Sequence, residues 1–384
     1  MTDKSEKRAA YAISAFYFLH YATLGIIFPF AGYFFRERGF SGTEIGLFLA
    51  IFPLAKFTIT NHWTQAFSRA RSKHLFIAVC IFCSSVSLVP LAFTGNRIIT
   101  GLMLVFFAFS RAGVIPVMDS IAISMDGRIP YGRLRLFGSI GFIVTSITAG
   151  VMMDTFGLNA FIWTFMGAGL LSITASLFVD FSVDALKPTH KSDRKLTPEL
   201  VVFFSALTVY LTSFAFLSNF FNIKVAEAGF SQSQAGYMWT IGVVSEIFFL
   251  YNQEKVLKIF SVKTLIALSM ALGGVRYLVT GYTDSLFLLA FFSAFHGFAY
   301  GTFHIGVMRY IRTCVPDRIK LKAQSMYSGV SYGLGSIAGS AISGIIYDMN
   351  GLRSVFTAAF LFCAVSAVII FFFTGRGGRA YEVA

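Results

Sequence analysis

Residues 39–46, GFSGTEIG, lie between two long apolar segments of the chain, and a related octapeptide, GFSQSQAG at 229–236, lies between two others. A second pattern also occurs twice, first as Gly141, Gly150, Asp154, Gly157 and Leu158, then as Gly335, Gly344, Asp348, Gly351 and Leu352. The two patterns keep the same order along the chain. They predict two halves built on one plan, a parallel repeat of the kind found in secondary transporters.

The longest polar connection separates these halves. It reads SVDALKPTHKSDRKLTP at residues 182–198, and its two prolines and mixed charge are typical of a linker. We therefore expect an N-terminal half at 1–181, a cytoplasmic linker at 182–198 and a C-terminal half at 199–384.

The composition places the chain in a membrane. Of its 384 residues 56% are hydrophobic and only 13% charged, against about 25% charged in soluble domains, which excludes an ordinary cytoplasmic enzyme. A helix needs about 20 apolar residues to cross the hydrocarbon core. Segments of that kind predict an all-α integral membrane protein with twelve transmembrane helices, six in each half, at 10–35, 43–66, 75–94, 98–125, 134–155, 158–181, 199–224, 233–253, 262–281, 285–314, 322–348 and 352–374.

The net charge of +13 raises the question of an acidic partner such as nucleic acid. Most of the 31 Lys and Arg residues, however, fall in the two tails and in every second connection. Cytoplasmic segments of membrane proteins carry such an excess. This distribution excludes a nucleic-acid surface and predicts a multi-pass membrane protein with both termini in the cytoplasm. We expect its location to be a bacterial inner membrane.

The cysteines give no sign of a metal site. Cys80 and Cys83 have the spacing of redox and zinc motifs, but neither a second pair nor a group of histidines accompanies them. Cys314 and Cys363 also belong to apolar segments. We expect small buried thiols, with no metal and no cofactor.

Charged residues inside the predicted spans are the functional candidates, because a charge in the hydrocarbon region costs about 2.5–3.5 kcal/mol or more. Asp119 and Arg135 lie equally far from the turn near Gly127, which places both about 12 Å from that turn on neighbouring helices. They either form a salt bridge that fixes the helices or share a ligand in a cavity.

The C-terminal half holds Glu246, Arg276, His296 and His304 within predicted spans. His296, Tyr300 and His304 recur every four residues, which places them on one side of a helix. Histidine titrates near physiological pH, and burial can shift a carboxylate there. We therefore interpret the stripe as a cavity wall and Glu246, His296, His304 and Asp119 as proton carriers, although a buried histidine can also be merely hydrogen-bonded.

The N-terminal half adds His20 with Tyr17 and Tyr21 in the first predicted span, Lys56 in the second and Arg111 in the fourth. Arg111 precedes Asp119 by about 12 Å along the helix axis. The two are therefore not expected to pair directly.

Nine stretches of the sequence together form a family pattern: GIIFPF at 25–30, GFSGTEIG at 39–46, PVMD at 116–119, YGRLRLFGSIGF at 131–142, GYMW at 236–239, GVVSE at 242–246, GVR at 274–276, the segment 296–304, and MRYI at 308–311. With these stretches the chain resembles the major facilitator superfamily over nearly its whole length. Within that superfamily it is similar to the 3-phenylpropionate permease family, relatives of lactose permease.

The resemblance implies a proton-coupled importer that works by alternating access. In lactose permease an acid and an arginine of these motifs bind the sugar, and the matching positions here are Asp119 and Arg135. Its span-nine arginine and span-ten histidine, which serve coupling and binding, match Arg276 and His296. The carboxylate that it uses for its proton, one turn after that histidine, is Ala299 here.

Other positions also depart from lactose permease. Its span-eight acid falls at Val243, and Glu246 follows one turn later. Glu246 and His304 look like the pattern of the phenylpropionate family. Arg111 is peculiar to this sequence and offers a contact to an anionic substrate.

We expect symport of protons with a small carboxylate-bearing solute, an aromatic acid being one candidate. A proton-coupled oligosaccharide or nucleoside permease and an exporter of a larger anionic compound remain alternatives. An intramembrane enzyme would need a metal or nucleophile constellation that the sequence lacks, so we expect a monomeric transporter with a small molecule, protons and the lipid bilayer as its partners. The residues expected to bind the solute are Asp119, Arg135, Arg276, His296, Tyr300, Arg111, His20 and Tyr21, and those expected to carry the proton are Glu246, His296, His304 and Asp119.

Overall fold

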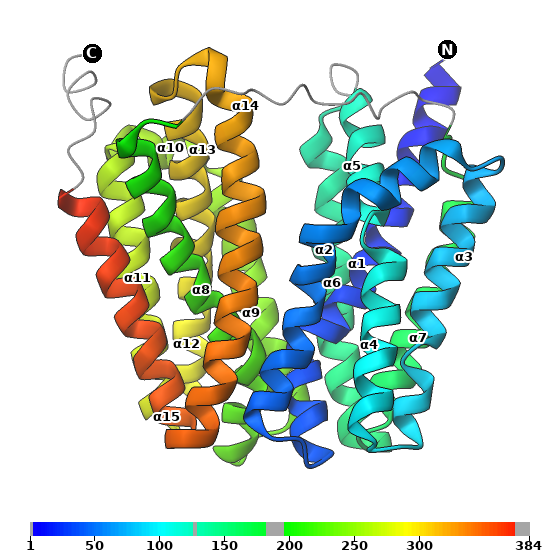
Figure 1. Ribbon diagram of the computed structural model, residues 1–384, viewed down its shortest axis with the longest axis horizontal. Coiled ribbons are helices and arrows are strands. Elements are labelled where there is room, and N and C mark those ends of the chain that lie inside the picture. Colours follow the sequence, from blue (N-terminus) through cyan, green and yellow to red (C-terminus); the bar gives the residue numbers. More distant parts are fainter. Residues whose placement is uncertain (1–2, 126–128, 182–195, 373–384) are drawn as a thin grey trace. The chain divides into compact units, whose positions relative to one another are not determined.

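The computed structural model describes residues 3–125, 129–181 and 196–372, and within these ranges the chain is helical apart from short connections (Figure 1). Nine helical stretches of this described part are long and apolar enough to cross a membrane. One of them, Asp317–Phe372, has non-helical backbone angles at Gly351, where two helices meet. The predicted fold class, an all-α membrane protein, is confirmed.

The described residues divide into two compact units, which we describe separately. Unit 1 takes its residues from Met1–Phe40, Ile51–Thr189 and Ser231–Gly236. In this unit α1 packs along α6 and α7, and α3 packs along α7. The helices that lie wholly or mostly in unit 1 are α1 (Asp3–Glu37), α2 (Gly42–Arg69), α3 (Lys73–Val86), η1 (Val89–Ala92), α4 (Arg97–Arg111), α5 (Val114–Ser124), α6 (Tyr131–Phe156) and α7 (Ala160–Ser176).

Unit 2 takes its residues from Ser41–Ala50, His190–Phe230 and Tyr237–Ala384. In this unit α15 packs along both α8 and α11 (Figure 1). The helices of this unit are α8 (Pro198–Glu227), α9 (Gln232–Tyr251), α10 (Gln253–Ile259), α11 (Val262–Tyr282), α12 (Leu286–His296), η2 (Gly297–Thr302), α13 (Phe303–Cys314), α14 (Asp317–Ser325), η3 (Met326–Leu334) and α15 (Gly335–Phe372).

The predicted spans lie where the helices lie, but some helices differ from the prediction in length or in helix type. The 17-residue α7 and the 20-residue α9 occupy the predicted sixth and eighth spans without being among the nine long apolar stretches. The predicted tenth and eleventh spans each contain a π-helical segment, η2 and η3. The count of twelve and the boundaries of the two halves stay predictions.

The fourth predicted span is broken where the sequence suggests a continuous helix. α4 ends at Arg111 and α5 begins at Val114, because Pro116 has no N–H to donate to the carbonyl of Ala112. The Thr60 hydroxyl donates to that freed carbonyl at 3.3 Å. The break sets Arg111 and Asp119 on separate helices.

Four glycines of the sequence repeat, Gly39, Gly157, Gly229 and Gly351, lie in connections between helices and share one property. Their φ angles are 77°, 82°, 85° and 74°, and no non-glycine residue in the described part has positive φ. A side chain at these positions would strain the backbone. These repeated glycines therefore mark turns whose backbone conformation only glycine adopts freely.

The two repeated patterns contact each other. In unit 1 the Asp154 carboxylate at the end of α6 accepts hydrogen bonds of 2.9 Å from the backbone N–H groups of Gln232 and Ser233, which open α9. In unit 2 the Asp348 carboxylate accepts bonds of 2.6 and 2.7 Å from Gly42 and Thr43, which open α2. Each aspartate thus satisfies free donors at the positive end of a helix.

Glycines permit this approach of the helices. A Cβ added at Gly236 would lie 2.2 Å from the carbonyl oxygen of Ser146, and one at Gly46 would lie 2.2 Å from that of Ser340. Such contacts are closer than any side chain tolerates, so these positions require glycine.

Replacing either capping aspartate should destabilise the protein. Asp154→Asn and Asp348→Asn each weaken two hydrogen bonds to a helix start and remove a favourable charge there, at a cost of about 1 kcal/mol. Thermal unfolding in detergent should show a lower midpoint for both variants and an unchanged one for Glu254→Gln, which alters an exposed carboxylate. Equal midpoints for all three variants would contradict the capping role.

Candidate functional site

Asp119 on α5 is held by two tyrosine hydroxyls. Tyr17 of α1 donates to its Oδ1 at 2.6 Å, and Tyr131, the first residue of α6, donates to the same oxygen at 3.1 Å. Tyr17 is fully buried, whereas Asp119 is half-buried. Both hydroxyls therefore engage the same carboxylate oxygen, Oδ1.

Arg135 on α6 faces the same group of tyrosines. Its guanidinium carbon lies 3.8 Å from the centre of the Tyr21 ring and 5.7 Å from that of Tyr17, which is close cation–π geometry. In the described part of the chain Asp119 and Arg135 form no direct ion pair, although both contact the same tyrosine, Tyr17. Lys56, whose side chain is exposed, lies within electrostatic range of both charges.

Arg111, at the end of α4, forms a second group with α1. Its guanidinium donates to His20 Nε2 at 2.9 Å and to Thr23 Oγ1 at 2.8 Å. The guanidinium also lies over the ring of Phe107, 5.1 Å from its centre. Because a guanidinium only donates, His20 Nε2 is the acceptor and a neutral ring carries its proton on Nδ1. His20 is 2% exposed, and this Nδ1 has no hydrogen-bond partner.

Unit 2 contains an arginine–histidine–carboxylate group. Arg276 of α11, which is 4% exposed, donates to His296 Nδ1 at 3.1 Å. The other ring nitrogen of His296, Nε2, lies 3.6 Å from Glu246 Oε2 of α9. Accepting from Arg276 places the proton of a neutral His296 on Nε2, which faces the carboxylate.

Small residues bring Glu246 to this position. The backbone N–H of Gly297 donates to Ser245 Oγ at 2.9 Å, and a Cβ at Gly297 would lie 2.3 Å from the Ser245 carbonyl carbon. A Cβ at Gly301 would lie 3.5 Å from Glu246 Cγ. The carboxylate therefore packs beside the π-helical segment η2, and such segments often mark functional positions in helices.

The second histidine of the stripe, His304, contacts tyrosines of η3. Its Nδ1 lies 3.0 Å from the hydroxyl of Tyr327, and that hydroxyl lies 3.3 Å from the one of Tyr332. The rings of Tyr332 and Tyr300 also meet edge to face, with centres 6.3 Å apart. The rings of His296 and Tyr300 are stacked with centres 5.4 Å apart, as are those of Tyr300 and His304 at 6.4 Å, which agrees with the predicted stripe on one helix side.

The structure thus sorts the predicted site residues into three groups. Asp119, Arg135 and Tyr21 are together, His20 joins Arg111, and Arg276 joins His296 and Glu246, with Tyr300 and His304 beside them. Sequence reasoning did not include four participants, Tyr131, Thr23, Tyr327 and Tyr332. Tyr131 is the first residue of the motif that contains Arg135, so the sequence could have indicated it. Tyr327 and Tyr332 lie in the π-helical segment η3, which has no sequence signal.

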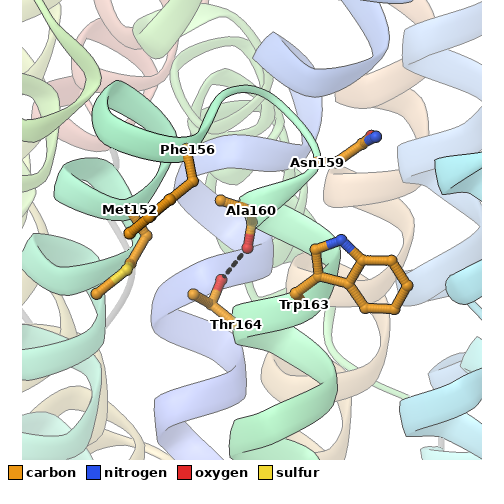
Figure 2. Close-up of a pocket in the computed structure, with 6 residues that line it drawn as sticks. All are labelled: Met152, Phe156, Asn159, Ala160, Trp163 and Thr164. Carbon is orange, nitrogen blue, oxygen red and sulfur yellow. Dashed lines mark hydrogen bonds between the residues drawn. The ribbon is translucent and has the colours of Figure 1, made fainter.

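A surface pocket at the junction of α6 and α7 is unrelated to these groups. Figure 2 shows its lining residues, Met152, Phe156, Asn159, Ala160, Trp163 and Thr164. None of them is charged, and the Thr164 hydroxyl donates to the carbonyls of Ala160 and Phe161 in its own helix. The pocket contains no predicted site residue.

An all-helical, multi-pass fold with arginine, histidine and carboxylate groups inside its apolar helices defines the class of membrane transporters. The chain belongs to the MFS_1 like family, which it matches over residues 10–358.

Relatives with assigned names agree with this class. The chain is 24% identical to the "Probable 3-phenylpropionic acid transporter" of Escherichia coli (strain K12), covering 87% of this chain and 90% of that protein. It is 23% identical to the xanthosine permease of the same organism, with 93% of each covered. Among solved structures, the nucleoside transporter NupG (D323A mutant) superposes with a TM-score of 0.81 at 18% identity, over 95% of this chain and 98% of that one.

Proposed function

We propose that the protein imports a small solute bearing a carboxylate, coupled to inward proton movement, by alternating access in a bacterial inner membrane. We also propose that it acts as a monomer with both termini in the cytoplasm. The single observation that carries the proposal is the Arg111–His20 pair, beside which the described residues place no carboxylate.

One of the two arginine–histidine pairs has a carboxylate beside it and the other does not, and this difference supports the proposal. In unit 2 the pair Arg276–His296 has a carboxylate beside it, Glu246, at 3.6 Å. In unit 1 the pair Arg111–His20 has only Thr23 as a further hydrogen-bond partner in the described residues, and His20 Nδ1 is unpaired. A cation at membrane depth is costly without an anion. A carboxylate of the solute would supply that anion.

Proton coupling is supported by the groups of unit 2. Glu246 and His296 keep 23% and 15% of their side chains exposed, so neither is sealed from water. A histidine and a carboxylate in contact can hold one proton more or one fewer at physiological pH. This pair can therefore take up a proton with the solute and release it afterwards, so that each step favours one conformation of the transporter.

Arg111→Gln should remove the preference for an acid. We expect the wild type to bind 3-phenylpropionate at least about tenfold more tightly than its uncharged analogue 3-phenylpropanamide, because a guanidinium–carboxylate bond is charge-assisted. Glutamine keeps a hydrogen-bond donor but no charge, so the variant should bind both compounds alike. Calorimetry on purified protein measures both affinities.

The matched control is Arg353→Gln, which removes an arginine that lies over the ring of Tyr282 in unit 2. It should keep the acid-over-amide ratio of the wild type. A ratio that Arg111→Gln leaves unchanged would refute the role assigned to Arg111.

A nucleoside is the second candidate solute. The fold is similar to that of NupG and the sequence to that of a xanthosine permease. The stacked rings of His296, Tyr300 and His304 also suit a flat heterocycle. Thermal-shift measurements with xanthosine, maltose and 3-phenylpropionate distinguish the solutes, because a ligand that binds the folded protein raises its unfolding temperature.

A further inference from the structure

Arg111, on which the proposed recognition of an acid depends, lies at the edge of a break in the helical backbone. α4 ends at Arg111, α5 begins at Val114, and Ala112 and Gly113 connect the two helices. One continuous helix therefore does not fix the backbone on both sides of Arg111. Contacts from other helices must fix this connection, and the same contacts determine where the guanidinium reaches.

Trp63 of α2 contacts the break on both sides of Arg111. Its indole N–H donates to the carbonyl of Ser110, the residue before Arg111, at 3.1 Å. A Cβ added at Gly113 would lie 2.1 Å from Cε3 of the same indole. The ring therefore lies directly against the backbone of Gly113, where a larger residue would collide with it. One side chain thus holds the residue before Arg111 and the last residue before α5.

Trp63 is fixed in turn by aromatic neighbours. It is 6% exposed, and its ring meets that of Phe76 in α3 edge to face, with centres 4.9 Å apart. On its own helix it stacks on Phe67, with ring centres 6.1 Å apart. A large ring packed in this way does not change its orientation without displacing its neighbours. α2 and α3 therefore give the break a rigid support.

The partners of Arg111 on α1 are fixed as well. The Thr23 hydroxyl donates to the carbonyl of His20 at 2.6 Å, so its oxygen is oriented to accept from Arg111. His20 and Thr23 are both 2% exposed. The two hydrogen bonds of Arg111 use one guanidinium nitrogen, Nη2, and a guanidinium carries five N–H groups in a planar fork. With Nη2 held by α1, the donors on Nη1 and Nε have a defined direction.

We propose that Trp63 is a positioning residue for solute recognition in unit 1. It fixes the end of α4 so that Nη2 of Arg111 binds α1 and the rest of the guanidinium faces the carboxylate of the solute. This inference rests on the proposed function and adds a residue that determines its preference for an acid. An arginine side chain has many rotamers, and holding its backbone lowers the entropy that is lost when it binds a carboxylate. Trp63 acts through Arg111 and does not touch the solute.

Nitrogen NMR of the solute-free, full-length protein tests the position of Arg111 without any solute. The chain has six histidines, and isotope-labelled histidine makes their ring nitrogens visible. The signals that disappear in His20→Gln belong to His20. Arg111→Met removes the donor to His20 Nε2 and shows how far that signal moves when the bond is lost. We expect Trp63→Phe, which keeps an aromatic ring and removes the indole N–H, to move the signal in the same direction.

The same variant should lose much of the preference for an acid. Calorimetry should show the ratio of the affinities for 3-phenylpropionate and 3-phenylpropanamide falling from about tenfold or more to about twofold, because a misplaced guanidinium makes a weaker charge-assisted bond. A purely structural role of Trp63 would lower both affinities alike and keep their ratio.

Gly113→Ala keeps the proposal testable if Trp63→Phe fails to fold. It retains the indole and places a methyl group against it, which pushes the break away from Trp63. We expect it to move the His20 signal and to lower the acid-over-amide ratio as Trp63→Phe does.

The matched control is Trp163→Phe in the same unit, which changes an indole that is 42% exposed and meets the ring of Phe93. It should keep the wild-type His20 signal and the wild-type ratio. Wild-type values of both quantities in Trp63→Phe and Gly113→Ala would overturn the proposal. A change in only one of the two quantities would also overturn it, because Trp63 would then not act on the solute through Arg111.

The wild type separates this result from a failure of the proposed function. If the wild type binds the acid and the amide alike while Trp63→Phe moves the His20 signal, Trp63 positions Arg111 and the proposed carboxylate solute is wrong. If the wild type prefers the acid and the variants change neither the signal nor the ratio, only the role of Trp63 is wrong.

Discussion

Glu246→Gln should abolish accumulation of 3-phenylpropionate driven by a pH gradient and leave exchange of the solute across the membrane largely intact. Net symport requires the carrier to bind and release a proton in every cycle, and glutamine cannot ionise. Exchange requires only that the loaded protein change conformation, and glutamine imitates the protonated carboxyl in shape and hydrogen bonding.

The expected loss in net uptake is about 100-fold or more, the scale of removing an essential acid–base group. Proteoliposomes loaded with unlabelled solute measure exchange, and solute-free vesicles with an alkaline interior measure net uptake. Glu254→Gln, which alters an exposed carboxylate on α10, serves as control and should retain both. Equal loss of exchange and net uptake in Glu246→Gln would show that Glu246 serves binding or folding and not coupling.

Asp119→Asn should lose solute uptake in both assays. The Asp119 carboxylate accepts from the hydroxyls of Tyr17 and Tyr131, and its negative charge acts on the nearby guanidinium of Arg135. An amide offers one acceptor oxygen and no charge, so the guanidinium of Arg135 is left without its counter-charge. Breaking one partner of such a partly buried charged group typically costs 2–5 kcal/mol, or about 30-fold or more in binding.

Loss of folding must be separated from loss of binding in this variant. Tyr17→Phe is the companion change, because it removes the 2.6 Å bond to Asp119 and keeps the carboxylate. We expect Tyr17→Phe to weaken uptake less than Asp119→Asn, with both variants unfolding cooperatively in detergent. Wild-type uptake by Asp119→Asn would exclude Asp119 from the site.

The repeat is the part of the fold that the sequence predicts best. Glycines with positive φ at Gly39, Gly157, Gly229 and Gly351 are visible as letters, because no other residue adopts that backbone freely. The sequence does not show which helix each repeated pattern contacts. That Asp154 caps α9 and Asp348 caps α2 follows from long-range packing, which no local rule supplies.

The charged site residues were visible for a different reason. A charge within an apolar span is expensive, so Asp119, Arg111, Arg276 and Glu246 could be selected one by one. Their grouping could not, because it depends on which helix faces which. Asp119 and Arg135 were expected to pair or to share a ligand; the described residues show no direct ion pair between them, and a shared ligand stays a prediction.

Uncharged participants were missed because nothing marks a tyrosine as special in a chain with 16 of them. Tyr327 and Tyr332 belong to η3, a π-helical segment that shifts the register of the following side chains. Periodicity alone treats that segment as ordinary α-helix and assigns its side chains to other faces.

The most direct test of the account is uptake of 3-phenylpropionate by proteoliposomes with and without an alkaline interior. Protein-free vesicles correct for diffusion of the uncharged acid through the lipid. The account predicts that the gradient drives protein-dependent accumulation above the outside concentration, that a protonophore abolishes it, and that addition of solute alone makes the vesicle interior more acidic. Protein-dependent uptake that is the same with and without the gradient, or uptake no greater than in protein-free vesicles, would contradict proton-coupled transport of a carboxylate.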